Sequence, residues 1–186
     1  LKEMKDISSN YYIISIINWI KFITSVVSKK TGKPFLYEDF QKNIIRCVIL
    51  FYAKHHISTH MSSVQYILNT LLDINDSKQN VSFMLKKYQS SVAAFQIPRR
   101  HGKSFVVSII IFSAILCLKG INIVYVAHQK QATKQTYDLV MQFLKEYKKE
   151  SSVGFIQSVA NKSITVFSKD RQPMNYVTFL CGQQDV

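Results

Sequence analysis

The sequence predicts an α/β protein in which a helical N-terminal region leads into a core built on a partial parallel sheet with a hairpin. Two observations carry this prediction. Apolar residues recur at helical spacing through the first ninety residues, and strand-like and helix-like segments alternate beyond them. Such alternation indicates a right-handed βαβ unit in a parallel sheet. We therefore expect two regions, residues 1–90 and residues 91–186.

Helices are expected throughout the first region. The first of them ends at the breaker cluster Thr31-Gly32-Lys33-Pro34, because Gly and Pro interrupt helices. The polar run at residues 75–80 is interpreted as a loop, and its last residue, Asn80, can cap a short final helix. The expected helices span residues 7–27, 38–54, 63–74 and about 80–88.

The second region alternates between strands and helices. A strand at residues 91–97 leads into a helix at residues 103–118 that is apolar nearly all round, and we expect this helix to be buried on both sides. The continuous apolar character of residues 121–127 is typical of a buried parallel strand. The remaining expected elements are an amphipathic helix at 132–149 and two strands that pair as a hairpin, 163–168 and 176–181.

The composition excludes disorder and narrows the class of partner. Hydrophobic residues are 47% and charged residues 19% of the 186 residues, which is ordinary for a globular domain. Lys and Arg number 24 against 11 Asp and Glu, giving a net charge of +13. Such a surplus indicates a polyanionic partner, namely nucleic acid, nucleotide phosphates or an anionic membrane. AT-rich coding would produce the same basic bias, so the charge alone leaves the partner open.

No membrane partner is expected. The most apolar run, Phe105 to Leu118, is too short to cross a bilayer. Polar residues interrupt the apolar stretch at 12–27, which we interpret as an amphipathic packing helix, with membrane association as the minor alternative. The three cysteines are far apart and form no CxxC pair, which fits a reducing compartment.

A phosphate-binding motif stands where the strand at 91–97 meets the following helix. Residues 102–104 read Gly-Lys-Ser, the second half of the P-loop pattern GxxxxGK[ST], whereas Ile97 replaces the first glycine. The N–H groups and the dipole of a helix N-terminus favour phosphate, and Gly102 lets the backbone approach it closely. Lys103 would reach the β- and γ-phosphates, and the Ser104 hydroxyl would ligate Mg²⁺. The motif therefore predicts a P-loop NTPase core that binds ATP and Mg²⁺; the alternative is a basic turn that reads Gly-Lys-Ser by chance.

Two arginines, Arg99 and Arg100, lie inside the predicted loop. A guanidinium close to the γ-phosphate can neutralise the charge that develops in phosphoryl transfer, an effect of about 10³–10⁵ in rate. The alternative is that one or both form surface ion pairs, which contribute little to stability. Pro98 has no N–H to donate, so the loop must differ from the standard phosphate cradle.

The sequence Pro-Arg-Arg-His-Gly-Lys-Ser at residues 98–104, together with Ile-Val-Tyr-Val-Ala-His-Gln-Lys at 123–130, resembles the ATPase of the herpesvirus terminase large subunit. The resemblance implies an ATP-driven translocase that threads viral double-stranded DNA into a procapsid in the host cell nucleus. It also implies a C-terminal nuclease in the complete subunit. The partners it implies are the other terminase subunits, the capsid portal and further copies of the full-length chain.

The resemblance also implies the roles of individual residues. Lys103 and Arg99 take catalytic roles, the latter as an arginine acting in cis, and Ser104 is the metal ligand. Gln41 resembles an adenine-contacting glutamine, although a surface glutamine on a helix is the likelier interpretation from base rates. The implied nucleotide-binding residues are Pro98, Arg99, Arg100, His101, Gly102, Lys103, Ser104 and Gln41.

The sequence lacks one part of the hydrolytic machinery. Hydrolysis needs an apolar strand that ends in Asp-Glu, which holds Mg²⁺ and orients water, and the 186 residues contain none. We therefore expect a fragment that stops before this element and hydrolyses little ATP alone. The rival hypotheses are another P-loop ATPase such as a helicase, and a non-catalytic nucleic-acid-binding or scaffold protein. His56 and His60 form a minor candidate metal pair that lacks a third ligand.

Overall fold

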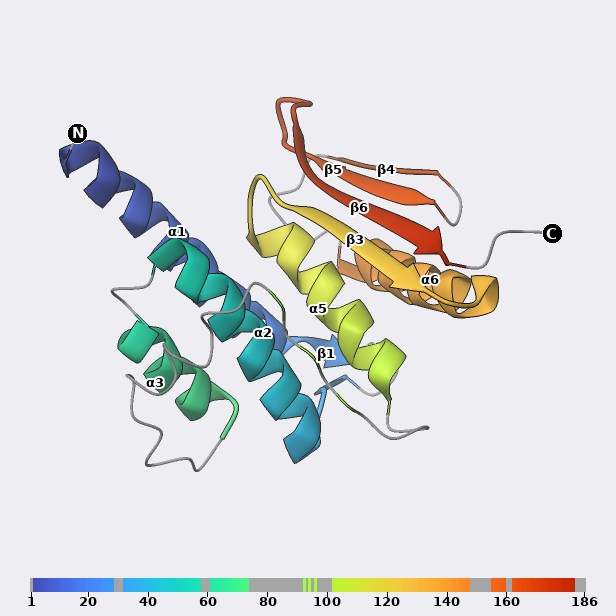
Figure 1. Ribbon diagram of the computed structural model, residues 1–186, viewed down its shortest axis with the longest axis horizontal. Helices are drawn as coiled ribbons and strands as arrows, with labels where there is room; N and C mark the ends of the chain where they lie inside the picture. The colour runs from blue at the N-terminus through green and yellow to red at the C-terminus, as the bar shows by residue number, and fades with distance from the viewer. Residues whose placement is uncertain are drawn as a thin grey trace. The chain divides into compact units, whose positions relative to one another are not determined.

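The computed structural model describes residues 2–28, 32–57, 61–73, 92, 94, 96, 102–147, 155–159 and 162–182 (Figure 1). These residues form a mixed α/β structure with five helices, a two-stranded ribbon and a four-stranded sheet. The chain divides into two compact units, Leu1–Arg99 and Arg100–Val186. The division lies nine residues beyond the boundary predicted from the sequence, and each unit is described by itself.

The first unit is helical in its described part, as the sequence predicts. Its elements are α1 (Lys2–Ser25), β1 (Val27–Ser28), β2 (Lys33–Pro34), α2 (Asp39–Ile57) and α3 (Met61–Leu71). The helices expected at 7–27, 38–54 and 63–74 are confirmed, with ends displaced by a few residues. Two residues of the breaker cluster, Lys33 and Pro34, form β2, and Gly32 directly before them adopts a positive φ of 63°. The short helix expected at about 80–88 lies outside the described residues.

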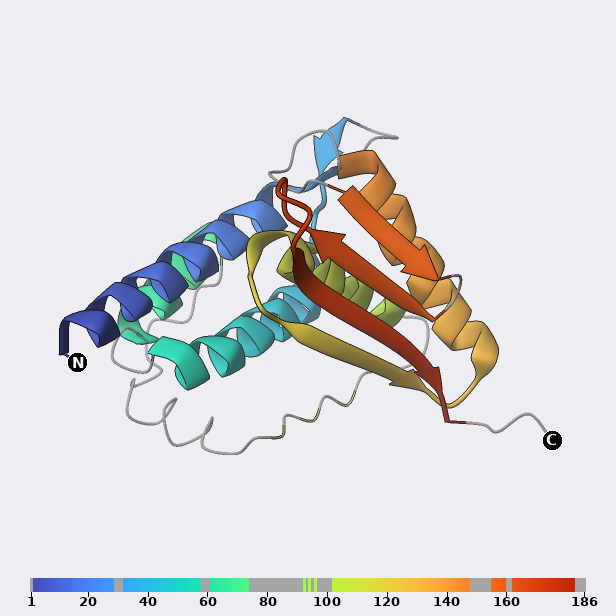
Figure 2. The ribbon, with the colours of Figure 1, turned by 90° about the horizontal axis from the view of Figure 1, so that it is seen from above.

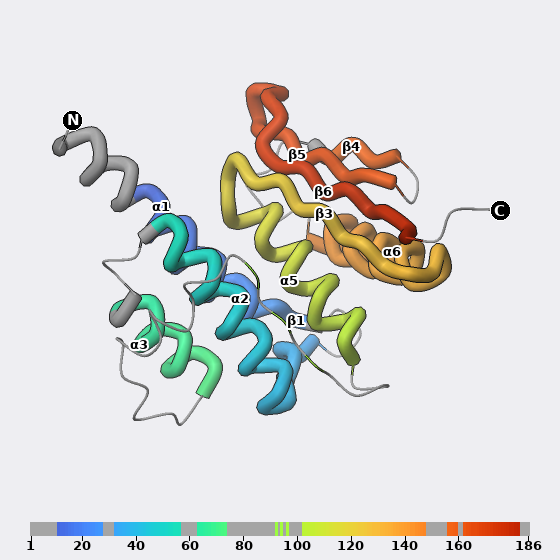
Figure 3. The backbone as a smooth tube through the Cα atoms, in the orientation of Figure 1, coloured from blue at the N-terminus to red at the C-terminus, as the bar shows by residue number. Residues whose placement is uncertain are grey.

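The core of the first unit forms along one face of α1. Ile16, Trp19, Ile20 and Ile23 follow helical spacing and are buried, as the amphipathic interpretation of this segment requires. The indole of Trp19 meets the Tyr52 ring of α2 edge-on at 5.8 Å. All helices in the described part of the chain are too short or too polar to cross a membrane. Figure 3 traces the backbone of α1, α2 and α3, the helices of this unit.

The second unit is a sheet with two helices. Its elements are α5 (Lys103–Cys117), β3 (Asn122–Ala127), α6 (Lys130–Tyr147), β4 (Phe155–Val159), β5 (Ser163–Phe167) and β6 (Pro173–Cys181). The strand order is β3-β6-β5-β4, with β3 parallel to β6 and the other neighbours antiparallel. The predicted hairpin is confirmed as β5 and β6. Strand β4 was not predicted, because its polar residues Gln157 and Ser158 hide the apolar alternation.

Both helices of the second unit cover the same face of the sheet (Figure 2). The Tyr137 ring of α6 meets the Phe179 ring of β6 at 5.3 Å, and the α5 rings of Phe105 and Phe112 lie against Phe143 of α6. Helix α5 is apolar through most of its circumference and eight of its residues are buried, as predicted. The core of this unit therefore lies between one sheet face and this helix pair.

The prediction that residues 121–127 form a buried parallel strand is wrong in its burial. Strand β3 is parallel to β6, but it lies at the edge of the described sheet, and every second residue is exposed. Val124 and Val126 are 60% and 61% exposed, because they point to the face that α5 and α6 do not cover. The continuous apolar character of residues 121–127 therefore does not indicate that both faces of the strand are buried.

The strand expected at residues 91–97 is only partly testable. Val92, Ala94 and Gln96 are described and have no regular secondary structure, whereas the residues between them and Ile97 lie outside the described part. Among the residues that the structure describes, the parallel pair is β3 with β6.

Candidate nucleotide-phosphate site

The described part of the predicted phosphate loop is the start of α5. Gly102 stands at the N-cap with φ 67° and ψ 22°, a left-handed conformation that residues with a Cβ rarely adopt. It makes no side-chain cap, but its carbonyl accepts the N–H of Val106 at 3.1 Å. The left-handed residue directs the chain into the helix. The glycine is therefore required by the geometry of this turn.

Lys103 and Ser104 are both exposed at the first turn of α5. This first turn contains no acidic residue, so the partial positive charge of the helix N-terminus is not offset within it. One turn further on, the Ser108 hydroxyl donates to the Ser104 carbonyl at 2.7 Å, which leaves the Ser104 side chain out of that bond. The exposed ammonium, the exposed hydroxyl and the helix N-terminus suit phosphate and its Mg²⁺ ion. Pro98, Arg99, Arg100 and His101 lie outside the described residues.

The start of α5 lies at the edge of the sheet where β3 and β6 end (Figure 1). We call this the carboxyl edge; it consists of the ends of β3 and β6, the turn before β5, and the first turns of α5 and α6. Helix α5 runs antiparallel to β3, so its first residues return to this end. Ligands of open α/β sheets bind outside the carboxyl ends of the strands. The fold therefore places Lys103 and Ser104 at the edge where such a site is expected.

Hydrogen bonds join the parts of the carboxyl edge. The N–H of Gly182 donates to the carbonyl of Ala127 at 2.8 Å, and the Thr133 hydroxyl of α6 donates to the carbonyl of Leu180 at 3.3 Å. The Cys181 thiol donates weakly to the carbonyl of His128 at 3.4 Å. The exits of β3 and β6 and the start of α6 are thus joined, and His128 itself is exposed beside them.

Gln41 lies in the other unit and has a structural role. Its side-chain oxygen accepts the N–H of Glu38 at 3.1 Å, directly before α2 begins. This is the backward half of a capping box, which satisfies a backbone donor at a helix start. Gln41 is 9% exposed, so the expectation of a surface glutamine is wrong. Its predicted contact with adenine stays a prediction.

His56, one residue of the minor candidate metal pair, stacks between two tyrosine rings. The His56 imidazole lies between the Tyr12 ring of α1 at 4.7 Å and the Tyr52 ring of α2 at 4.4 Å. Partial burial, and then the charge of His55, lowers the pKa of His56 below 6.5. His60 lies outside the described residues, and among the residues that are described no group of three His, Cys, Asp or Glu could hold a metal ion.

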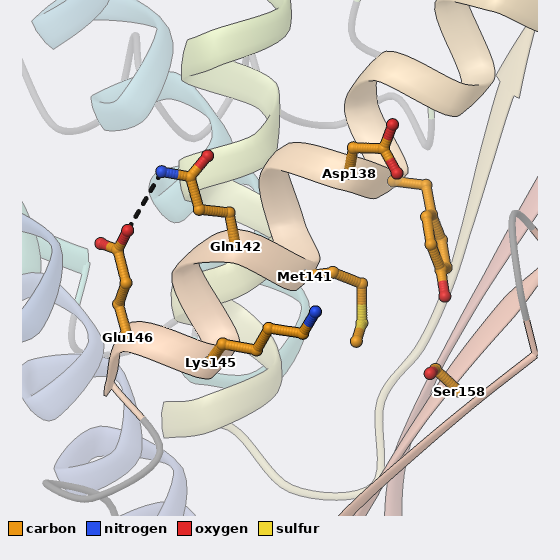
Figure 4. Close-up of a pocket in the computed structure, with 7 residues that line it drawn as sticks. Asp138, Met141, Gln142, Lys145, Glu146 and Ser158 are labelled. Atoms are coloured by element: carbon orange, nitrogen blue, oxygen red, sulfur yellow. Dashed lines mark hydrogen bonds between the residues drawn. The ribbon is translucent and has the colours of Figure 1, made fainter.

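A separate cavity of about 560 Å³ opens along α6 (Figure 4). Its wall carries both signs of charge, and Gln142 donates to the Glu146 carboxylate at 3.0 Å within it. None of the residues predicted to bind nucleotide lines it. The lining residues are Tyr137, Asp138, Met141, Gln142, Lys145, Glu146 and Ser158.

Asn175 is the residue of this unit that sequence reasoning missed. It is fully buried and joins three backbone groups, donating to the carbonyls of Ile115 and Leu118 and accepting the N–H of Ile121. It therefore ties the end of α5 and the approach to β3 onto β6. The sequence offered a weak signal only, because an asparagine two residues after Pro173 is typical of a turn.

Comparison with known proteins shows the family of the chain. The family described as "Probable DNA packing protein, N-terminus" matches residues 5–181. The protein named tripartite terminase subunit 3 of human cytomegalovirus (strain Merlin) is 31% identical over 126 residues, covering 67% of this chain and 18% of the relative.

Two further relatives carry the same name. The protein of human herpesvirus 6B (strain Z29) is 35% identical over 96 residues, covering 52% of this chain and 14% of its own length. That of varicella-zoster virus (strain Dumas) is 25% identical over 128 residues, covering 69% and 16%. The chain thus spans less than a fifth of the length of these curated relatives.

Proposed function

The chain belongs to the DNA packing protein family, and from that premise we propose that it forms the ATP-binding part of a viral DNA-packaging motor, the large subunit of a terminase. The observation that carries the proposal is the start of α5 at the carboxyl edge. There a left-handed Gly102 precedes the exposed Lys103 and Ser104 at a helix N-terminus without acidic residues. That combination suits a triphosphate and its metal ion.

Each residue of the proposed site has a distinct role in binding the nucleotide. The Lys103 ammonium binds the β- and γ-phosphates, and the first N–H groups of α5 donate to phosphate oxygens. The Ser104 hydroxyl would be the ligand that this chain offers to a Mg²⁺ ion. The ion supplies charge neutralisation on the phosphates. Arg99 and Arg100 precede this turn in sequence, and we propose Arg99 as the residue that neutralises the γ-phosphate.

The proposal extends to the longer protein. The relatives are named as subunits of a tripartite terminase, so we propose that this chain acts with other subunits, the capsid portal and further copies of itself. Its cargo is viral double-stranded DNA and its place of action is the host cell nucleus. Coupling of ATP hydrolysis to translocation belongs to the complete motor, and we assign nucleotide binding to the part described.

The test is binding of Mg²⁺–ATP to the Lys103→Ala variant, measured by isothermal titration. A hydrogen bond to a charged group contributes about 1.5–3 kcal/mol, so binding should weaken by about tenfold or more. The matched control is Lys119→Ala, which removes an exposed lysine just beyond the other end of α5 and should leave the affinity unchanged. Equal affinities for the wild type and Lys103→Ala would overturn the proposal and favour the non-catalytic nucleic-acid-binding hypothesis.

A further inference from the structure

The carboxyl edge carries more positive charge than one phosphate site needs. Besides Lys103, three exposed lysines lie there, in the first two turns of α6 and in the turn before β5: Lys130, Lys134 and Lys162. Lys130 and Lys134 are four residues apart on α6, so both project from one helix face about 6 Å apart along the axis.

Backbone contacts bring Lys162 to the same place. Its carbonyl accepts the N–H of Phe179 at 2.7 Å, and the next residue, Leu180, accepts the hydroxyl of Thr133 from α6. The turn that holds Lys162 and the first turns of α6, which hold Lys130 and Lys134, therefore both contact the end of β6.

Acidic side chains lie elsewhere among the described residues of this unit. They number three: Asp138 in the third turn of α6, Glu146 near its end, and Asp170 in the turn between β5 and β6. Glu146 and Asp170 belong to the opposite edge of the sheet, where they accompany Lys145, Lys169 and Arg171. Asp138 is the acid nearest to the lysines along the helix, one turn beyond Lys134. Among the described residues the carboxyl edge is thus a strip of lysines with one acidic neighbour, Asp138 on the helix face of Lys134, whereas acidic and basic side chains are mixed at the opposite edge.

We infer that Lys130, Lys134 and Lys162 contact the phosphate backbone of duplex DNA, and that DNA therefore binds at the same edge of the sheet as the nucleotide. The inference rests on the proposed function for the identity of the polyanion. Exposed lysines on helix and turn positions suit backbone phosphates, because such contacts need charge and reach and do not need a shaped pocket.

The placement has a mechanical consequence. The first turns of α5 and α6 both begin at this edge, and Thr133 holds α6 to β6 one residue before Lys134. A change at the phosphates of a bound nucleotide would thus occur beside the lysines that hold DNA. Nucleotide binding and DNA binding at the same edge can be coupled without any path through the core of the sheet.

The experiment compares two triple variants of the full chain. Lys130→Gln, Lys134→Gln and Lys162→Gln are combined in one, and Lys119→Gln, Lys169→Gln and Arg171→Gln in the other, so that both lose three charges. Affinity for a fluorescent 30-base-pair duplex is measured over a salt series. For three lost contacts the slope of log K against log salt should fall by about 2.7, and the affinity at low salt by about tenfold or more. The control should keep most of its slope.

Three outcomes decide the inference. Equal losses in both variants would show a general effect of net charge and overturn it, as would unchanged binding in the first variant. A loss of Mg²⁺–ATP affinity without a loss of DNA affinity would assign the strip to the nucleotide and overturn it too. The single variants Lys130→Gln and Lys162→Gln, with circular dichroism, replace the triple variant if it does not fold. Lys103→Ala tests the nucleotide site separately, so failure of that proposal is distinguishable from failure of this one.

Discussion

The side-chain amide of Asn175 donates a hydrogen bond to the carbonyl of Leu118 at 2.7 Å and so ties strand β6 to the residue that caps the end of α5. The same nitrogen reaches the carbonyl of Ile115 at 2.7 Å, and the side-chain oxygen accepts the N–H of Ile121 at 3.0 Å. One buried polar side chain therefore satisfies three backbone groups where α5 ends and the chain approaches β3. The opposite end of α5 is the proposed nucleotide site.

Replacing Asn175 by alanine should destabilise the protein strongly. Each buried backbone group left without a partner costs about 1–3 kcal/mol, so the free energy of unfolding should fall by at least about 3 kcal/mol. Chemical denaturation checks this value. Asn122→Ala, at an exposed position of β3, is the control and should change stability by no more than about 0.5 kcal/mol. Similar stabilities for the two variants would contradict the role of Asn175.

The two faces of the sheet should respond differently to the same truncation. Val177 is fully buried under the helices, so Val177→Ala should cost roughly 2 kcal/mol through lost burial and a small cavity. Val126 is 61% exposed on the uncovered face, so Val126→Ala should cost less than about 0.5 kcal/mol. Thermal unfolding of both variants measures the difference. A larger loss for Val126 would mean that this face is covered in solution.

Gln41→Ala separates a structural role from a ligand-binding role. Loss of the capping contact to Glu38 should lower the free energy of unfolding by about 1 kcal/mol. Asn43→Ala, exposed on the same helix, is the matched control. If Gln41→Ala weakens Mg²⁺–ATP binding while stability stays unchanged, the adenine contact implied by the resemblance gains support and the capping account fails.

The Cys117 thiol should resist alkylation in the folded protein. Burial raises its pKa from 9.0 to about 12, and the thiolate is the reacting species, so at pH 9 its rate should be lower by about 500-fold than in the unfolded chain. The folded state holds this proton more tightly, so the associated stability is present below about pH 9 and is lost as pH rises toward 12. Iodoacetamide labelling followed by mass spectrometry, with and without urea, measures the rates. Fast native labelling would show that the end of α5 opens.

Much of the fold could be predicted because its signals are local. Helix α5 is apolar through most of its circumference, and its start carries Gly-Lys-Ser, the second half of the P-loop pattern. The hairpin of β5 and β6 follows from two alternating segments around a short polar turn. Strand β4 escaped prediction because its polar residues Gln157 and Ser158 interrupt the apolar alternation, and a strand of five residues offers too few positions to show a period.

The sequence by itself determined the helical character of the first unit, the position of α5 and the residues of the phosphate motif, since these depend on residue spacing and on backbone preferences such as the positive φ of Gly102. Only the tertiary structure decided that β3 is an edge strand, that Gln41 and Asn175 serve as buried structural partners, and that Lys162 joins Lys130 and Lys134 at one edge. These facts depend on which residues distant in sequence meet in space. Strand order and burial are properties of pairing between segments, and no segment carries them alone.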